Sequence, residues 1–185
     1  MYKNISTPIT DEVIDTLKAG DFVYITGTIY TARDAAHARL YSTIQNNESI
    51  PFELSNNIVY YLGPTPARPG QVIGSAGPTT SSRMDKYTPL LLEQGMKGMI
   101  GKGKRSENVR QSVMKNGAVY FAAVGGAGAL LSKAIVSSEV IAYEDLGTEA
   151  IRKLEVRDFP VIVVIDSKGD NLYETAVKQY NKESL

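Results

Sequence analysis

Hydroxyl and basic side chains stand together in the segment Gly77–Asp85, where they could hold a small anion. The dipeptide Gly77-Pro78 predicts a turn, and the hydroxyl residues that follow it are good helix N-caps. Arg83 then falls in the first turn of a predicted helix. Free backbone N–H groups, hydroxyls and a guanidinium would therefore converge on one point, an arrangement that suits a carboxylate or a phosphate.

Two further segments offer cationic groups. Arg33 opens a predicted helix directly after a predicted strand, and a cation there opposes the helix dipole unless an anion lies beside it. Lys102 follows another predicted strand, at the carboxyl end where open α/β sheets bind ligands. The alternatives are a surface ion pair between Arg33 and Asp34, and a solvated basic turn around Lys102. The functional interpretation is a cationic site for a small anionic substrate.

The composition narrows the class of protein. A chain of 185 residues predicts one domain spanning residues 1–185. A formal net charge of zero argues against a nucleic-acid-binding protein. No apolar run approaches the roughly 18 residues of a membrane span. We therefore expect a cytoplasmic protein that contacts neither nucleic acid nor membrane.

The cysteine and histidine counts limit the chemistry. The chain has no cysteine and one histidine, His37. It can form no disulfide, use no thiol nucleophile and hold no iron–sulfur cluster through its own thiolates. A zinc site of the usual cysteine and histidine type is also excluded. If the protein catalyses a difficult reaction, many of the catalytic groups would have to come from another chain or from a cofactor.

Hydrophobic periodicity predicts alternating strands and helices after Gly77 and a β-rich first third. Strands are predicted at 21–30, 58–62, 71–75, 97–101, 118–124, 139–143, 154–156 and 161–166, and helices at 33–45, 84–94, 106–115, 129–135 and 173–181. The strands 58–62 and 71–75 are interpreted as a hairpin around a Pro-rich loop, with an interdomain linker as the alternative. The alternation favours a layered α/β unit with a mainly parallel sheet.

The glycine-rich segment Gly125–Gly128 lies between a predicted strand and a predicted helix. This placement raises the hypothesis of a dinucleotide site, but Leu131 stands where the third glycine of that fingerprint belongs. The other interpretation is close backbone packing, or a loop that lets a ligand approach.

Four blocks in this order resemble the beta subunit of the iron–sulfur (class I) fumarate hydratase and tartrate dehydratase family. They are Gly27–His37, Gly77–Asp85, Met99–Gly103 and Gly125–Ala129. The resemblance covers about residues 7–172. It implies the swivelling β/β/α fold, an α/β layered domain with a mixed, partly parallel sheet. It also implies a hydro-lyase that interconverts fumarate and malate, with a [4Fe–4S] cluster held by a separate alpha subunit.

The resemblance also implies roles for individual residues. Arg33, Arg83 and Lys102 would bind the dicarboxylate, and Thr79 would take the C3 proton. Residues expected to line the same site are His37, Thr80, Ser81 and Gly126. The acid that protonates the leaving hydroxyl is expected in the alpha subunit.

Three alternatives remain open. The same machinery could act on tartrate or on mesaconate, because one methyl group changes binding by only about 1–3 kcal/mol. Asp85 favours fumarate, since tartrate enzymes are expected to have glutamate there. The chain could instead be a non-catalytic dicarboxylate-binding domain, or bind a nicotinamide cofactor.

Overall fold

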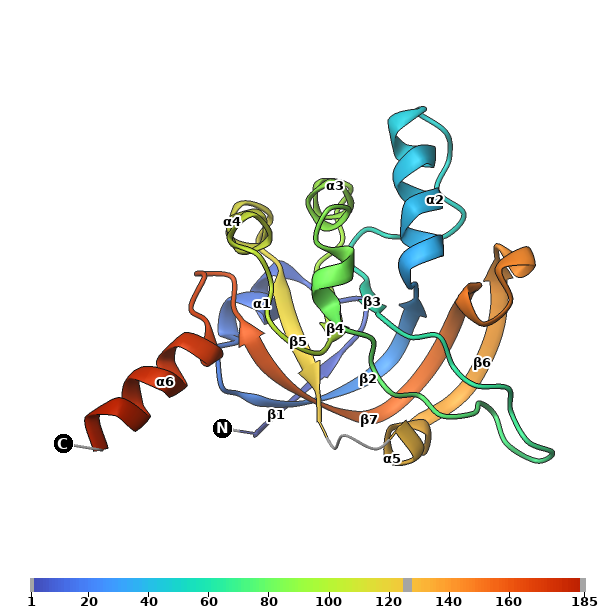
Figure 1. Ribbon diagram of the computed structural model, residues 1–185. Helices are drawn as coiled ribbons and strands as arrows, with labels where there is room; N and C mark the ends of the chain where they lie inside the picture. Colours follow the sequence, from blue (N-terminus) through green and yellow to red (C-terminus); the bar gives the residue numbers. More distant parts are fainter. Residues whose placement is uncertain (1, 125–127, 184–185) are drawn as a thin grey trace.

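The computed structural model describes residues 2–124 and 128–183, built around a seven-stranded sheet of mixed direction (Figure 1). Its elements are β1 (Tyr2–Ser6), α1 (Asp11–Thr16), β2 (Phe22–Thr31), α2 (Asp34–Gln45), β3 (Ile58–Tyr60), η1 (Ser81–Met84), α3 (Thr88–Glu93), β4 (Gly98–Gly101), α4 (Glu107–Asn116), β5 (Val119–Ala123), α5 (Gly128–Ser132), β6 (Ile135–Ala142), η2 (Glu144–Glu149), β7 (Ile151–Ile165) and α6 (Leu172–Glu183). The predicted mixed α/β class is confirmed.

The strand order is β1-β2-β3-β4-β5-β7-β6, with an additional pairing between β2 and β7. The first five strands in this order are parallel to their neighbours, and β7 runs antiparallel to β2, β5 and β6. Because β7 pairs with both β5 and β2, the pairings form a closed cycle through β2, β3, β4, β5 and β7. The carboxyl ends of β2 to β5 therefore meet on one edge of this cycle.

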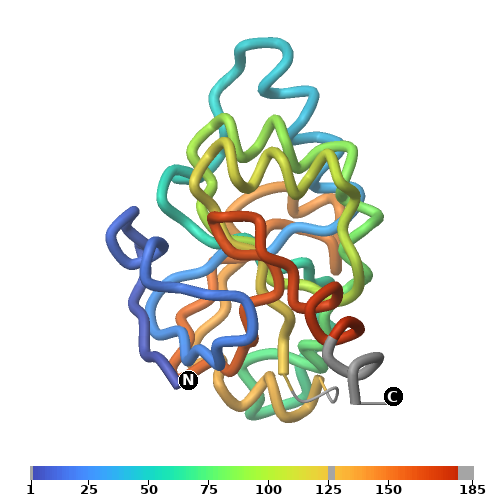
Figure 2. Tube along the Cα trace, turned by 90° about the vertical axis from the view of Figure 1, so that its left-hand side faces the viewer, coloured from blue at the N-terminus to red at the C-terminus, as the bar shows by residue number. Residues whose placement is uncertain are grey.

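Apolar side chains of the strands alternate between two core clusters. Ile58 and Tyr60 of β3 belong to the first cluster, whereas Val59 and the following Tyr61 belong to the second. The second cluster also contains the buried faces of α2, α3 and α4, which lie on one side of the sheet in both views (Figures 1 and 2). The alternation follows from the twofold period of a strand.

The helices begin and end for local reasons. Ser106 is the N-cap of α4 and accepts a hydrogen bond from the Val109 amide at 3.3 Å, and Gly117 ends the helix in a left-handed conformation. Both features match the prediction. The predicted helix 84–94 begins later, at Thr88, with Pro89 in its first turn, where a missing amide costs nothing.

The predicted hairpin of 58–62 and 71–75 is wrong. Both edges of β3 are occupied, because it pairs in parallel with β2 and with β4. Residues 71–75 form no strand; the Ser75 amide instead donates to Thr65 Oγ1 at 2.7 Å. The segment between Gly63 and Gly77 is therefore a loop whose two sides are joined by this hydrogen bond, and it is called the pinned loop below.

The predicted strands 154–156 and 161–166 are parts of one strand, β7. Between the two predicted segments β7 has a local irregularity: Asp158 has a positive φ of 49°, and the register with β2 shifts between Ile25 and Gly27. The strand β1 and the helix α1 were not predicted. Within the described ranges, no helix has the length and apolar character that crossing a membrane requires.

Candidate functional site

The segment that follows the pinned loop crosses the carboxyl ends of β3 and β4. The Thr79 amide donates to the Tyr61 carbonyl at 2.7 Å, directly after β3. Thr80 forms a parallel β-bridge with Lys102, and the Ser81 amide donates to the Lys102 carbonyl at 2.9 Å. Backbone hydrogen bonds therefore bring Thr79 and Lys102, which lie far apart in sequence, to one edge.

Asp34 joins the two arginines of the site. Its Oδ1 accepts from Arg83 Nε at 2.9 Å, and its Oδ2 lies 3.8 Å from Arg33 Nε. Asp34 is the first residue of α2, which follows β2. The sequence therefore places Arg33 beside β2, and Asp34 brings Arg83 to the same place.

The Arg33 side chain packs against Gly63 and Glu149. A Cβ added at Gly63 would lie 2.6 Å from Arg33 Cδ and 2.8 Å from its NH1, so a larger residue there would displace the Arg33 side chain. Glu149 Oε1 lies 3.7 Å from Arg33 Nε on another side. Arg33 is the N-cap of α2 and makes no side-chain capping bond to the helix.

Both arginines approach acidic side chains through Nε. Arg83 Nε donates a hydrogen bond to Asp34, whereas Arg33 Nε lies 3.7 and 3.8 Å from Glu149 and Asp34 and makes no hydrogen bond in the described part of the chain. Among the described residues, the terminal nitrogens of Arg33 and Arg83 have no hydrogen-bond or ion-pair partner. The Arg83 side chain is 52% exposed. The end of a guanidinium that carries NH1 and NH2 matches a carboxylate in bidentate geometry. Each arginine can therefore bind one carboxylate in addition to Asp34.

The remaining predicted side chains differ in exposure. Lys102 and Thr80 are exposed, and Thr79 is half-buried. None of these three side chains forms a hydrogen bond or ion pair with another residue in the described part of the chain. The site is thus an open edge with free cationic and hydroxyl groups.

Ser81 points into the protein. Its side chain is fully buried, and its Oγ forms a hydrogen bond with the Tyr120 hydroxyl at 2.8 Å. A Cβ at Gly101 would lie 1.9 Å from Ser81 Oγ, so this approach requires glycine in β4. Burial raises the pKa of Tyr120, which therefore stays neutral. Ser81 anchors the segment that carries Thr79 and Arg83.

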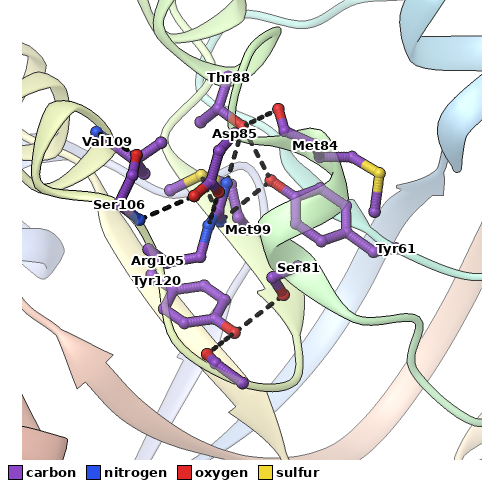
Figure 3. A network of polar contacts seen from close by, with 11 residues as sticks. Tyr61, Ser81, Met84, Asp85, Thr88, Met99, Arg105, Ser106, Val109 and Tyr120 are labelled. Carbon is purple, nitrogen blue, oxygen red and sulfur yellow. Dashed lines mark hydrogen bonds and ion pairs between the residues drawn. The ribbon is translucent and has the colours of Figure 1, made fainter.

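Arg105 is the centre of a buried polar network beneath the site (Figure 3). Its Nε lies 2.6 Å from Asp85 Oδ1, and its terminal nitrogens donate to Tyr61 and Thr88 at 3.2 and 2.8 Å. Asp85 Oδ2 also accepts from the Ser106 amide at 2.7 Å. The network fixes η1 against the start of α4. Sequence reasoning missed it, because Arg105 stands in a run of basic residues that looks uniformly solvated.

His37 lies under the site. It is fully buried, and its Nδ1 is 2.8 Å from the Arg33 carbonyl oxygen. A carbonyl can only accept, so Nδ1 carries the proton. Burial lowers the pKa of His37 to about 4, and the ring packs against Tyr61 and Tyr87. The neutral imidazole therefore supports the backbone at Arg33 from inside.

The glycine-rich segment is only partly described. Gly126, expected to line the site, lies outside the described residues. At Gly128 an added Cβ would lie 2.5 Å from the Gly77 nitrogen, and the Gly128 carbonyl accepts from the Ala76 amide at 3.1 Å. Close backbone packing therefore accounts for Gly128.

The site has anion-binding groups, and its donors do not suit a metal cluster. The chain contains no cysteine. Over residues 2–124 and 128–183, no group of three or more histidine, aspartate or glutamate side chains is arranged to hold a metal ion. An iron–sulfur cluster does not fit the groups that this part of the chain supplies.

The sequence is similar to one family of known proteins. The family described as "Fumarase C-terminus" matches residues 3–176. The aerobic class I fumarate hydratase of Escherichia coli (strain K12) is 40% identical over 152 residues, 81% of this chain and 28% of that protein. Fumarate hydratase 2 of Leishmania major is 38% identical over 156 residues, 83% of this chain and 28% of that protein.

A shorter relative matches over nearly its whole length. A putative L(+)-tartrate dehydratase subunit beta of Methanocaldococcus jannaschii is 36% identical over 177 residues, 92% of this chain and 91% of that protein. The chain thus spans less than a third of the two fumarate hydratases and most of the tartrate dehydratase subunit.

Proposed function

The chain belongs to the fumarase C-terminus family, and on this premise we propose that it is the beta part of an iron–sulfur-dependent hydro-lyase. The proposed reaction is the reversible hydration of fumarate to malate. The observation that supports the proposal is that backbone and ion-pair contacts bring the segments of Arg33, Arg83, Lys102 and Thr79 to one edge. Within the described ranges the terminal nitrogens of both arginines have no partner.

The three cations suit a dicarboxylate. Two arginines can each hold a carboxylate through NH1 and NH2, and Lys102, whose backbone pairs with Thr80, adds a point charge. In the dehydration direction the C3 carbanion places negative charge on the adjacent carboxylate. Cations that hold this carboxylate stabilise the transition state more than the ground state, which raises the rate.

Thr79 is the proposed base for the C3 proton. Its hydroxyl has no partner among the described residues, and its backbone is held by Tyr61. A threonine hydroxyl is a weak base, so it needs activation by its surroundings. The nearby cations favour the alkoxide form. The hydroxyl would first lose its proton to solvent, and the resulting alkoxide would accept the C3 proton, which restores the neutral hydroxyl. That proton would pass to solvent before the next turnover.

Class I fumarate hydratases depend on an iron–sulfur cluster, and we propose that a partner alpha subunit holds it. The absence of cysteine in this chain supports that division. The cluster would supply a Lewis acid toward the substrate hydroxyl and one carboxylate. The open edge around Lys102 and Arg83 leaves room for a second protein half to cover the substrate.

The same role in a tartrate dehydratase is the second candidate. It is favoured by the Methanocaldococcus relative, of which this chain covers 91%. A mesaconate hydratase would use the same groups with a methyl pocket. A non-catalytic dicarboxylate-binding domain would use the cations without the partner.

The experiment is anaerobic purification of this chain with its partner, followed by iron and sulfide analysis and hydration assays. Fumarate, mesaconate and tartrate are compared at equal concentration, with the Arg33→Ala complex as the control for background activity. The proposal expects iron in the complex and the highest rate with fumarate. A higher rate with tartrate would move the assignment to the second candidate. An iron-free chain that binds dicarboxylates alone would overturn the hydro-lyase function.

A further inference from the structure

Glu149 lies far from Arg33 in sequence but contacts its side chain. It ends η2, directly before β7, and its carboxylate meets the N-terminus of α2. Its Oε1 lies 3.7 Å from Arg33 Nε and accepts from the Ala35 amide at 3.4 Å. The Glu149 side chain is 27% exposed, so the contact lies at the border between the protein interior and the site.

We propose that Glu149 is a positioning residue for Arg33, an inference that rests on the proposed function. Glu149 and Asp34 flank Arg33 Nε at 3.7 and 3.8 Å. Gly63 lies against Cδ and NH1 on a third side. These contacts hold the guanidinium in place, and NH1 and NH2 keep no hydrogen-bond or ion-pair partner among the described residues.

The contact with Ala35 adds a second consequence. The N-terminus of a helix is a ready site for an anion, and Glu149 already supplies one to α2. The substrate carboxylate is therefore directed to the terminal nitrogens of Arg33 and away from the helix amides. Glu149 in this way fixes where one end of the dicarboxylate lies.

Two other roles for Glu149 predict different results. If Glu149 only competed with substrate for Arg33, its removal would tighten substrate binding. If it only tied η2 to α2, any other tie between these elements would matter equally. Asp145 provides that comparison, because it pairs with Arg39 of α2 through two hydrogen bonds of 2.8 and 2.7 Å without touching Arg33.

The first test uses the assembled enzyme with its partner. Glu149→Ala should raise KM for fumarate by about tenfold, since small displacements of a binding group have large effects, while kcat changes less. Glu149→Gln, which keeps an acceptor for the Ala35 amide, should fall between wild type and alanine. The control Asp145→Asn should leave both constants unchanged. A fall in KM, or equal effects of Glu149→Ala and Asp145→Asn, would overturn the proposal.

The second test does not need activity. In NMR spectra of the chain alone, the Nε–H signal of Arg33 is identified by its loss in Arg33→Lys. Glu149→Ala should shift this signal and speed its exchange with water, and Asp145→Asn should not. An unchanged Arg33 signal would also overturn the proposal. If the wild-type complex hydrates no dicarboxylate, the proposed function fails, and this spectrum still decides whether Glu149 positions Arg33.

Discussion

Two arginine clusters lie at this end of the sheet, and they differ in how much of each guanidinium is used. Every nitrogen of Arg105 has a partner, and its side chain is 0% exposed. Among the described residues, Arg33 and Arg83 approach acidic groups only through Nε, and the Arg83 side chain is 52% exposed. Arg105 is therefore built to stabilise the fold, whereas Arg33 and Arg83 keep binding capacity for a ligand.

The comparison shows that an arginine that stabilises the fold can be distinguished from one that can bind a ligand by counting the N–H donors that have no partner within the protein. A buried arginine must have all its donors satisfied, because an unpaired buried donor costs free energy. An arginine that binds substrate must keep donors free and still be held in one orientation. The hydrogen bond from Arg83 Nε to Asp34 meets both needs, because the two remaining nitrogens form a complete bidentate face. Arg33 Nε is held only by ion-pair contacts of 3.7 and 3.8 Å.

The largest expected effect is on activity. Arg33→Ala or Arg83→Ala should each lower kcat/KM of the assembled enzyme by about three powers of ten, which corresponds to roughly 4 kcal/mol of transition-state binding. The free energy of unfolding should change little, because the contacts removed are partly exposed ion pairs through Nε, which contribute at most about 1 kcal/mol each. Urea unfolding of the chain and steady-state kinetics of the complex measure both quantities. If both variants unfold, Arg33 and Arg83 stabilise the fold as Arg105 does, and the distinction between the two arginine clusters is wrong.

The opposite result is expected for Arg105→Met. The substitution leaves Asp85 as an unpaired charge with a side chain that is 15% exposed, and breaking such a pair typically costs about 3–5 kcal/mol. Urea unfolding should show this loss, and Lys104→Met, an exposed neighbour in the same basic run, serves as the control. Equal stability of the two variants would mean that the buried network does not hold the fold.

His37 predicts a dependence of stability on pH. Burial lowers its pKa to about 4 from 6.5, so between these values the unfolded chain binds a proton that the folded chain does not. Stability should therefore fall as pH decreases from 6.5 toward 4, by at most about 3 kcal/mol. Unfolding midpoints across this range should fall more steeply for wild type than for His37→Phe. Parallel curves would show that His37 does not cause the loss.

The smallest effect is expected for Lys102→Met. The side chain is exposed and has no partner among the described residues, so stability should not change. KM for fumarate should rise by about tenfold, which corresponds to roughly 1.4 kcal/mol, and kcat should change less. Kinetics of the complex at two salt concentrations would check the charge contribution. Unchanged kinetics would remove Lys102 from the site.

Local patterns predicted most elements of the fold. The β2, α2 and α4 ranges follow from apolar spacing and from caps such as Ser106 and Gly117. The hairpin failed because local sequence does not show that β2 and β4 already occupy both edges of β3. The two strands predicted at 154–156 and 161–166 are one strand, because β2 pairs with β7 on both sides of the irregularity at Asp158.

Candidate site residues could be named where a residue carries its own signal. Arg33, Arg83 and Lys102 were predicted from their places after predicted strands and at predicted helix starts, and the structure brings their backbone segments together. Glu149 and the buried state of Arg105 were not found. Both depend on contacts between residues distant in sequence, and neither lies in a pattern that distinguishes it from a solvated charge.

The pairing of β2 with β7 has a consequence for synthesis of the chain. It joins Phe22 to Ile162, so β2 leaves the ribosome long before its partner exists. At about 5–20 residues per second, this delay is on the order of 10 seconds. During that time the backbone groups of β2 that β7 will cover remain available to other strands, which is the condition that favours aggregation. The nascent chain should therefore engage a chaperone until residues 151–165 emerge.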